Sequence, residues 1–522
     1  MKRDEMLGRI QRDPDDWDFI VIGGGATGLG VAIEGASRGY KTVLLEQSDF
    51  AKGTSGRSTK LVHGGVRYLQ QGNVSLVLEA LKERGLLHQN APHLVHNQRF
   101  VVPNYDWWEG PFYGVGLKLY DVLAGKRGFG SSEWLSKEET LKRIPTVETE
   151  GLRGGIIYHD GQFDDSRLAM NMAQTAADQG GTVLNYMQVV DLLKSGGMVS
   201  GVVARDMETG DEHELSAKVV INATGPFTDN ICEMDDAGAP RMIKPSQGVH
   251  IVLDRSFLPG DSAIMVPHTA DGRVLFAIPW HNRTVVGTTD TSIDSVSLEP
   301  RPQADELEFL IAHAAKYLTK DPTEQDVLST FAGIRPLVSP EGEDDTASIS
   351  RDHTIHISRS GLVTIAGGKW TTYRKMAEDT IDQAATLAAL PDEPSVTSAL
   401  HIHGYHNHAE QFGALEVYGA DAMQIQDMIN AHPEYTELIH PELSIKTAEV
   451  IWAVREEMAR TVEDFLSRRT RTLLLDARKS MEAAPKVADL MAEELGRDAD
   501  WRDQQVEEYT ILAEGYTVGS GQ

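Results

Sequence analysis

A glycine-rich turn near the start of the chain constrains the fold more than any other segment. Residues 19–22 are apolar, as in a buried strand, and run directly into the pattern Gly-x-Gly-x-x-Gly at residues 23–28. Such glycines permit a tight strand-to-helix turn and let the backbone approach a pyrophosphate, which a helix N-terminus attracts. A second predicted strand, residues 41–45, ends at Glu46, where an acid that binds a ribose belongs. An ordinary glycine turn would not require Glu46, so the pattern predicts a dinucleotide site.

Length, charge and cysteine content narrow the class of protein. The 522 residues predict two or three domains, and the formal net charge of −29 disfavours a nucleic-acid partner, which needs a basic surface. Cys232 is the only cysteine, which excludes an internal disulfide and any multi-cysteine metal or iron–sulfur site, and we expect no metal. Residues 1–5 are charged and no apolar run approaches about 18 residues. We therefore expect no signal segment and no membrane-spanning helix. We also expect a cytoplasmic location.

Local patterns indicate an α/β chain in three parts. Helices are predicted near residues 75–90, 167–179, 303–318 and 371–388, and short β-rich runs between 248 and 287 predict an antiparallel sheet. Residues 408–497 are mostly helical by pattern and contain an arginine-rich stretch. The predicted parts are a discontinuous nucleotide-binding domain (1–75, 151–235 and 345–390), a substrate domain (76–150 and 236–344) and a helical C-terminal domain (391–522).

Glycine turns recur at strand ends far apart in the sequence. Besides residues 23–28, they occur at 223–225 and 367–368. A nicotinamide cofactor would need only the first turn, whereas a flavin that extends through the domain would use all three. The repetition therefore favours FAD over NAD.

With these turns in place, the chain resembles the FAD-dependent glycerol-3-phosphate dehydrogenases of the glycine-oxidase-like superfamily. The matching motifs cover the region 18–390 in the family's order, at residues 22–25, 60–69, 222–226, 287–290, 333–337, 350–352 and 367–374. The resemblance implies a Rossmann-like FAD-binding domain, an inserted antiparallel β-sheet substrate domain and a helical C-terminal cap. It also implies oxidation of sn-glycerol 3-phosphate to dihydroxyacetone phosphate, with electrons passing from reduced FAD to a membrane quinone.

The same resemblance implies which residues hold FAD. The first turn and its ribose-binding acid contribute Gly23, Gly25, Ala26, Thr27, Gly28 and Glu46. The loop that follows contributes Thr54, Ser55, Ser58, Thr59, Lys60, His63, Gly64 and Gly65. The later turns contribute Ala223, Thr224, Gly225, Gly368, Thr371 and Thr372. Thr371 and Thr372 would direct helix N–H groups toward the flavin, and simple N-capping is the competing interpretation. Arg57 either touches a cofactor phosphate or faces solvent.

A small dianionic substrate needs permanently charged donors, because phosphate is best held by arginine and lysine. The resemblance places four cations and one hydroxyl around the substrate, namely Arg67, Tyr68, Arg335, Arg351 and Lys369. Each cation alone would more often be a surface charge. Arg67 and Arg351 are the favoured phosphate ligands, and His250, Arg335 and Lys369 form the predicted catalytic set.

A general base is needed for the substrate hydroxyl, and a histidine suits that role near neutral pH. His250 heads a β-rich segment and is the first candidate, while His63, in the glycine-rich loop, is the second. A hydrogen-bonded structural histidine is the competing interpretation for both.

Aromatic residues with nearby basic residues, at 105–128, are typical of a membrane interface. An aromatic core under a loop is the alternative. Together with a quinone acceptor, this segment leads us to expect peripheral contact with the inner face of the cell membrane, and we also consider a homodimer.

Three other functions are considered. The first is a glycerol-3-phosphate oxidase that uses O2 and releases H2O2, which would share nearly all of these motifs. The second is another substrate-oxidising flavoenzyme of the superfamily, such as an amine or amino-acid oxidase, and the four cations argue against it. The third is a non-catalytic flavin-binding or tRNA-modification scaffold, and the acidic net charge disfavours nucleic-acid work.

Overall fold

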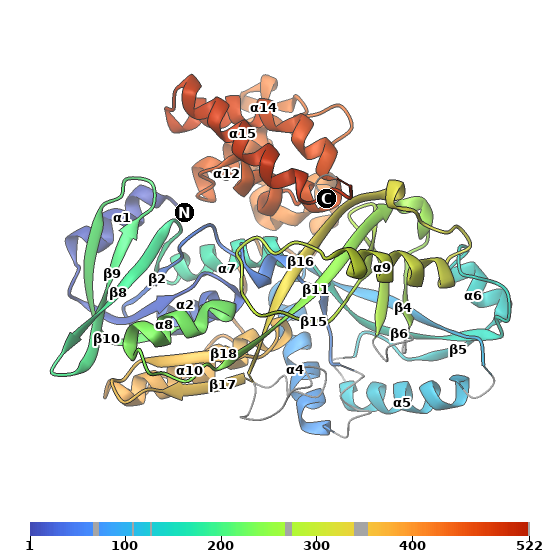
Figure 1. Ribbon diagram of the computed structural model, residues 1–522, viewed down its shortest axis with the longest axis horizontal. Coiled ribbons are helices and arrows are strands. Elements are labelled where there is room, and N and C mark those ends of the chain that lie inside the picture. The colour runs from blue at the N-terminus through green and yellow to red at the C-terminus, as the bar shows by residue number, and fades with distance from the viewer. Residues whose placement is uncertain (66–72, 107–108, 126–127, 267–273, 339–352, 520–522) are drawn as a thin grey trace.

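The chain builds two β-sheets that lie side by side, with a helical unit above their junction (Figure 1). The computed structural model describes residues 1–65, 73–106, 109–125, 128–266, 274–338 and 353–519. Helices and strands occupy most of the positions that the sequence patterns indicate. The α/β fold with a β-rich second part and a helical C-terminal part is confirmed.

The first sheet has a parallel centre, as a dinucleotide-binding fold requires. Strand β1 (Trp17–Ile22) lies between β2 (Thr42–Leu45) and β10 (Glu212–Asn222) and runs parallel to both. Strands β7 (Thr182–Leu184) and β18 (Val363–Gly367) extend the parallel part on either side. Antiparallel strands β17 (His353–Ile357), β8 (Met187–Ser195) and β9 (Met198–Asp206) complete the sheet. The carboxyl ends of β1, β10 and β18 therefore meet at one edge, each followed by a glycine turn.

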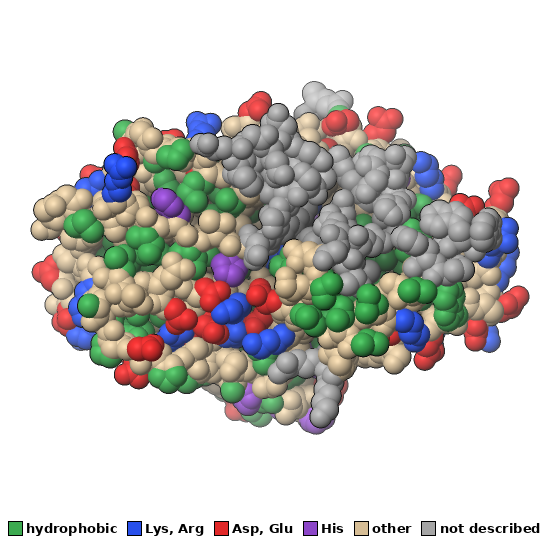
Figure 2. Space-filling model, turned by 90° about the horizontal axis from the view of Figure 1, so that it is seen from below, with side chains coloured by type: hydrophobic (Ala, Val, Ile, Leu, Met, Phe, Trp, Pro, Cys, Tyr) green, Lys and Arg blue, Asp and Glu red, His purple; other side chains and the backbone are tan. Residues whose placement is uncertain are grey.

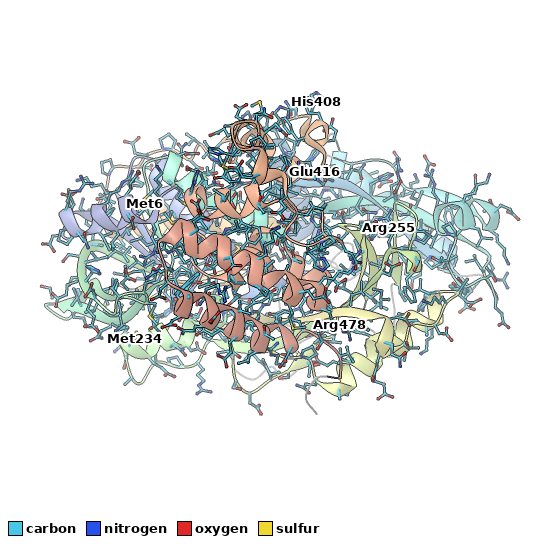
Figure 3. The ribbon with its side chains drawn as sticks, turned by 90° about the horizontal axis from the view of Figure 1, so that it is seen from above. Met6, Met234, Arg255, His408, Glu416 and Arg478 are labelled. Atoms are coloured by element: carbon cyan, nitrogen blue, oxygen red, sulfur yellow. The ribbon has the colours of Figure 1, made fainter. Side chains whose placement is uncertain are left out.

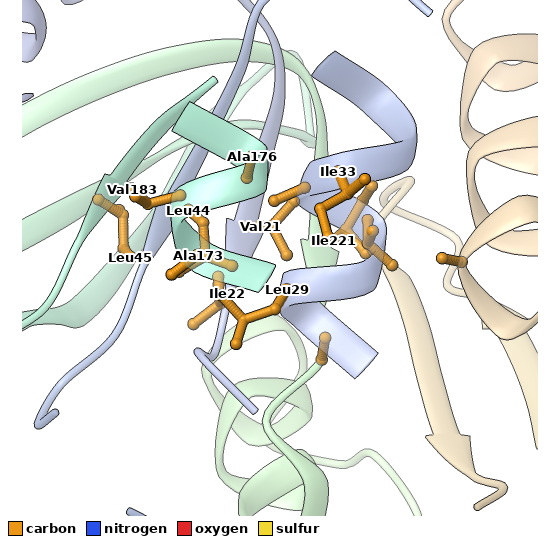
Figure 4. Close-up of a cluster of buried hydrophobic side chains, with 14 of the residues drawn as sticks. Val21, Ile22, Leu29, Ile33, Leu44, Leu45, Ala173, Ala176, Val183 and Ile221 are labelled. Atoms are coloured by element: carbon orange, nitrogen blue, oxygen red, sulfur yellow. The ribbon is translucent and has the colours of Figure 1, made fainter. Parts of the chain in front are cut away.

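Helices cover the first sheet because its strands are apolar on both faces. Helix α2 (Ala26–Ser37) packs against α7 (Asp165–Asp178) and α10 (Tyr373–Leu387), while α1 (Arg3–Arg12) and α8 (Thr228–Asp235) lie at the periphery. Figure 4 shows the interior of this layer, where Val21, Ile22, Leu29, Leu44 and Ala173 interlock. All five side chains are fully or almost fully buried. Burial of this kind supplies the main driving force for the domain.

The second sheet is larger and almost entirely antiparallel. Its path runs through β15 (Thr291–Ser292), β11 (Ile243–Asp254), β14 (Arg283–Gly287), β13 (Leu275–Trp280), β12 (Ser262–Val266), β4 (Val95–Asn104), β6 (Gly154–Phe163) and β3 (Leu61–Val62). Strand β16 (Val327–Val338) pairs with β11, and β5 (Glu133–Ser136) pairs with β6. Only β4 and β12 pair in parallel among the strands of this sheet that the structure describes. Helices α4 (Val74–Asn90), α5 (Glu109–Ala124), α6 (Lys137–Arg143) and α9 (Ala304–Tyr317) flank it.

One strand does not follow the predicted segment boundaries. Residues 151–163 were expected in the nucleotide-binding part, but β6 pairs along its length with β4 in the second sheet. The pairing of Leu61 and Val62 with Gln162 and Gly161 likewise places β3 there. The glycine-rich loop after β2 therefore crosses directly from one sheet to the other.

The C-terminal part is a helical cap seated on the second sheet. It contains α11 (Ala422–Ala431), α12 (Thr447–Glu456), a π-helical turn (Asp464–Arg469), α13 (Thr472–Leu475), α14 (Ala477–Leu495) and α15 (Ala499–Glu514). The core side chains of α13, α14 and α15 cluster with Val252, Trp280, Val285 and Phe331 of β11, β13, β14 and β16, while α11 contributes to a separate cluster. The cap and the second sheet therefore share a hydrophobic core.

His403 ties the segment that leads into the cap to the first domain. Its ring nitrogens lie 2.7 Å from Asp178 and 2.9 Å from Asp421. Burial alone would lower the pKa of His403, but the two carboxylates outweigh it and raise the pKa from 6.5 to about 9. This difference corresponds to roughly 3 kcal/mol of stability that depends on the imidazolium.

The folded-state pKa of His403 lies above the unfolded one, so the stabilisation is complete below pH 6.5 and is lost as the pH rises through about 9. We therefore expect His403→Gln to destabilise the protein most at acidic pH. The gap in unfolding free energy between parent and variant, from urea titrations below and above this interval, should narrow with rising pH. A gap that stays constant would contradict the assignment of a charged His403.

Candidate cofactor and substrate site

The turn between β1 and α2 leaves no room for side chains. Gly23 has φ of +110°, and a Cβ there would lie 2.6 Å from the carbonyl oxygen of Ala223. A Cβ on Gly28 would lie 1.9 Å from the carbonyl oxygen of Gly23. The first and second glycine turns thus abut each other, which brings the ends of β1 and β10 into one wall.

The N-terminus of α2 opens into this wall without a side-chain cap of its own. Gly25 is the N-cap residue, and the N–H of Ala26 is met by the Ser55 hydroxyl at 2.9 Å. Free N–H groups and the helix dipole make such a terminus a binding place for an anion. The geometry suits a pyrophosphate.

Glu46 stands at the end of β2, where its carboxylate accepts the N–H groups of Gly24 at 2.6 Å and Ser48 at 2.8 Å. Burial raises the pKa of Glu46, and the two N–H groups oppose that rise. The carboxylate is thus fixed beside the glycine turn, as a ribose-binding acid would be.

A cavity lined by residues of all three glycine turns lies here, and we take it as the cofactor site. Its walls include twelve of the residues predicted to contact FAD or substrate: Gly23, Gly25, Ala26, Thr27, Glu46, Thr54, Ser55, Ala223, Thr224, Gly225, Gly368 and Lys369. Pro336 of β16 also lines it, so the cavity extends from the first sheet to the second. The backbone cradle, the helix terminus and the reach from one sheet to the other fit a flavin dinucleotide.

Other predicted cofactor residues lie behind the cavity wall and support it. The N–H of His63 donates to Thr371 Oγ1 at 3.2 Å, which joins the glycine-rich loop to the start of α10. The N–H of Gly64 donates to the Tyr120 hydroxyl of α5 at 2.8 Å. Thr372 occupies the N-cap position of α10 but makes no side-chain capping hydrogen bond, so the N-capping interpretation is wrong for it. Gly65 has φ of +75°, a conformation that glycine adopts without strain.

Lys60, predicted to contact FAD, directs its side chain to α7. Its ammonium is completely buried and lies 2.7 Å from Asp165 and 2.8 Å from the carbonyl oxygen of Gly56. Ser58 also donates to Asp165, at 2.7 Å. Neither Lys60 nor Ser58 lines the cavity. A buried ammonium needs a carboxylate partner, and Asp165 supplies it to Lys60. The Lys60–Asp165 pair instead anchors the loop to α7.

Arg57 neither touches the cavity nor faces solvent, so both interpretations of it are wrong. Its guanidinium is buried and pairs with Glu299 at 2.8 Å. It belongs to the short 3-10 helix Thr54–Arg57, of which Thr54 and Ser55 line the cavity. The sequence offered no indication of Glu299, which is distant along the chain.

His250 lies on β11 at the seam between the two sheets. Its Nε2 is 3.0 Å from Thr59 Oγ1, and its ring stacks on Phe331 with the centroids 4.7 Å apart. The buried Nδ1 has no hydrogen-bond partner within the described residues. Burial lowers the pKa of His250 well below its usual value, and Lys60 and Arg335 lower it further. The imidazole is therefore neutral at physiological pH.

Arg335 lies on β16, opposite Ser246 of β11, and is held by the loop that follows β14. Its guanidinium donates to Thr288 Oγ1 at 3.1 Å and to the carbonyl oxygen of Thr289 at 3.0 Å, and it lies 3.3 Å from Asp290. A Cβ on Gly248 would lie 2.3 Å from it, so that glycine makes room for the guanidinium.

Two features of this arrangement escaped sequence reasoning. Trp370 lines the cavity and donates its Nε1–H to the carbonyl oxygen of Ser55 at 2.9 Å. Glu306 of α9 is buried and accepts the hydroxyls of Thr289 and Thr291 at 2.8 and 2.7 Å, which stiffens the loop around Arg335. In the sequence, Glu306 looks like any acidic residue in the first turn of a helix. Arg67, Tyr68 and Arg351 lie outside the described residues.

Comparison with known proteins identifies the family. The family described as FAD dependent oxidoreductase matches residues 18–374, and the C-terminal domain of alpha-glycerophosphate oxidase matches residues 362–502. The human mitochondrial glycerol-3-phosphate dehydrogenase is 41% identical over 95% of this chain and 72% of its own length. The Schizosaccharomyces pombe enzyme of the same name is 37% identical over 99% and 90%. The chain belongs to the FAD-dependent glycerol-3-phosphate dehydrogenase family.

Solved structures agree with this assignment. The glycerol-3-phosphate dehydrogenase of Bacillus halodurans, complexed with FAD, covers 100% of this chain and 98% of its own, with a TM-score of 0.82 and 31% identity. Glycine oxidase from Geobacillus kaustophilus, at 20% identity and a TM-score of 0.53, shares the fold. The predicted resemblance and the FAD cofactor are thereby confirmed.

Proposed function

We propose that this flavoenzyme oxidises sn-glycerol 3-phosphate to dihydroxyacetone phosphate and passes the electrons to a membrane quinone. The observation that carries the proposal is the 41% identity to glycerol-3-phosphate dehydrogenases along 95% of the chain. The reaction removes a hydride from C2 and a proton from the C2 hydroxyl. When bound, FAD supplies the two-electron acceptor.

Arg335 is suited to orient an anionic substrate beside the cavity. Its backbone neighbour Pro336 lines the cavity, and its guanidinium is held by Thr288, Thr289 and Asp290. A guanidinium is a permanently charged, planar donor whose geometry matches a phosphate. We assign Lys369, which lines the cavity at the third glycine turn, as the second cation of this site.

His250 is suited to take the hydroxyl proton, because a base must be unprotonated before the reaction starts. The buried position and the cations Lys60 and Arg335 keep its ring neutral. Thr59 and Phe331 fix the ring plane. Arg67 and Arg351 remain our proposed phosphate ligands and Tyr68 a further hydroxyl donor, from the motifs that contain them.

The electron acceptor divides the two leading candidate functions. The match of residues 362–502 to a domain named after alpha-glycerophosphate oxidase favours oxygen, whereas the 41% identical relatives are dehydrogenases. We expect the purified holoenzyme to oxidise sn-glycerol 3-phosphate with a quinone analogue and to release little peroxide under air. Release of one peroxide per substrate oxidised, with no increase in turnover when the quinone analogue is added, would favour the oxidase.

Substitution of Arg335 tests the substrate site in the same assay. Arg335→Lys keeps the charge but loses the planar donor pair, so the KM for sn-glycerol 3-phosphate should rise about tenfold. Arg255→Lys changes a partly exposed arginine in the 3-10 turn (Arg255–Phe257) that follows β11, labelled in Figure 3, and should leave the KM unchanged. Equal KM values in the two variants would remove Arg335 from the substrate site.

Helix α5 supports the proposed membrane contact. Val115 and Val122 are 72% and 75% exposed, Leu119 is 48% exposed, and all three lie on one face of the helix, while Leu117 and Tyr120 are buried on the other. Lys118 is exposed beside them. Figure 2, which views the molecule from below, shows hydrophobic side chains grouped on the half that contains α5.

This apolar face suits insertion into the interface of a bilayer, which a quinone reductase must reach. No helix among the described residues is long and apolar enough to cross a membrane. We therefore propose peripheral attachment to the inner face of the cell membrane. Trp107 and Trp108, expected in this contact, lie outside the described residues, and the Phe112 side chain is not described either.

Replacing Val115, Leu119 and Val122 by Ser should lower the fraction of enzyme that co-sediments with phospholipid vesicles. Dye-linked activity should survive, because these side chains do not contact the cavity. Ile511→Ser removes an exposed apolar side chain from α15, at the opposite end of the molecule, and serves as the control (Figure 1). Unchanged sedimentation of the triple variant would exclude α5 as the docking surface.

A further inference from the structure

One segment of the chain is bound on one side to the cofactor turn and on the other to the cap. This clasp segment comprises residues 46–57. On its cofactor side Glu46 accepts the N–H of Gly24 at 2.6 Å, and the N–H of Ala51 donates to the carbonyl oxygen of Gly24 at 3.0 Å. Residues 51–55 of the segment line the cavity. Movement of the clasp segment would therefore open the cofactor site.

On the other side of the clasp segment, Asp49 is bound by two arginines of the cap. Arg468 and Arg469, neighbours in the π-helical turn, donate to its carboxylate at 2.5 and 2.6 Å. All three side chains are buried. Burial alone would raise the pKa of Asp49, but the two guanidinium groups outweigh it and lower the pKa below its usual value. Asp49 is thus a buried anion whose only charged partners among the described residues come from the cap.

Lys52 makes a second connection to the cap, at the cavity wall itself. Its ammonium lies 2.8 Å from Glu463, whose other oxygen is bound by Arg468 at 2.7 Å. Burial alone would raise the pKa of Glu463, but Arg468 and Lys52 outweigh it and lower the pKa. Lys52, Glu463, Arg468 and Asp49 therefore form one chain of alternating charge that begins and ends on the clasp segment.

A third connection reaches the clasp segment from the C-terminal end of the cap. Arg57 pairs with Glu299 at 2.8 Å, and the Tyr516 hydroxyl donates to the same carboxylate at 2.9 Å. Figure 3, viewed from above, shows the cap helices lying over the middle of the molecule. The clasp segment is thus held near its start, its middle and its end.

We propose that the cap is a cofactor clasp, and that Glu463 and Tyr516 retain FAD by holding the clasp segment closed. Release of FAD requires residues 46–57 to move away from the glycine turn, and that movement must break ion pairs with the cap. Glu463 and Tyr516 act through Lys52 and Arg57 and are therefore positioning residues. Their effect falls on cofactor retention and leaves the chemical step unchanged.

The test is the rate of FAD loss from diluted holoenzyme, followed by the rise in flavin fluorescence. Glu463→Gln removes the charge opposite Lys52 and should speed FAD loss about tenfold, as expected for loss of a charged hydrogen bond. At saturating FAD its kcat should equal that of the parent. Glu494→Gln is the matched control, because Glu494 pairs with Arg455 within the cap and away from the clasp segment.

A merely structural role would give a different result. Glu463→Gln would then lower the unfolding temperature equally with and without FAD, and FAD loss would stay within about twofold of the Glu494→Gln rate, which would overturn the proposal. Tyr516→Phe removes only the hydroxyl that binds Glu299. This variant tests the proposal if Glu463→Gln does not fold. Faster FAD loss in Tyr516→Phe supports the clasp, and an unchanged rate overturns it.

Discussion

The close contact between the first two glycine turns is the constraint on which the site depends. Because Gly23 and Gly28 have no Cβ, the ends of β1 and β10 come together and the N-terminus of α2 faces the cavity. Glu46 then reaches the backbone of the first turn and fixes where the following loop starts. From there the loop crosses to the second sheet as β3, so the position of His63 and Gly64 also follows from the turn.

A strongly acidic chain keeps many of its cations inside. Lys60, Arg167, Arg468 and Arg469 are buried, and each is paired with at least one buried carboxylate. A buried ion pair does not by itself stabilise a fold, since desolvation offsets the attraction, but removing one partner costs about 3–5 kcal/mol. The pairs therefore specify how the loop, α7 and the cap fit together. Burial lowers the pKa of His250, and Lys60, one of these buried cations, lowers it further together with Arg335.

Local sequence patterns were enough to predict the glycine turns, the FAD site and most strands and helices, because glycine spacing and apolar periodicity act over short distances. These patterns did not predict the contacts of a side chain whose partner lies far along the chain. Lys60 and Arg57 stand among cofactor motifs, and only the fold shows that Asp165 and Glu299 bind them. The predicted boundary at residue 151 places β6 in the first domain, whereas its strand partner β4 belongs to the second sheet.

We infer that the cavity along the three glycine turns holds an FAD that sn-glycerol 3-phosphate reduces. Anaerobic mixing of the purified holoenzyme with that substrate, while the absorbance of oxidised flavin is recorded, tests this inference. We expect rapid and complete bleaching with sn-glycerol 3-phosphate and none with glycerol, which lacks the phosphate. Persistent oxidised-flavin absorbance with sn-glycerol 3-phosphate would contradict it.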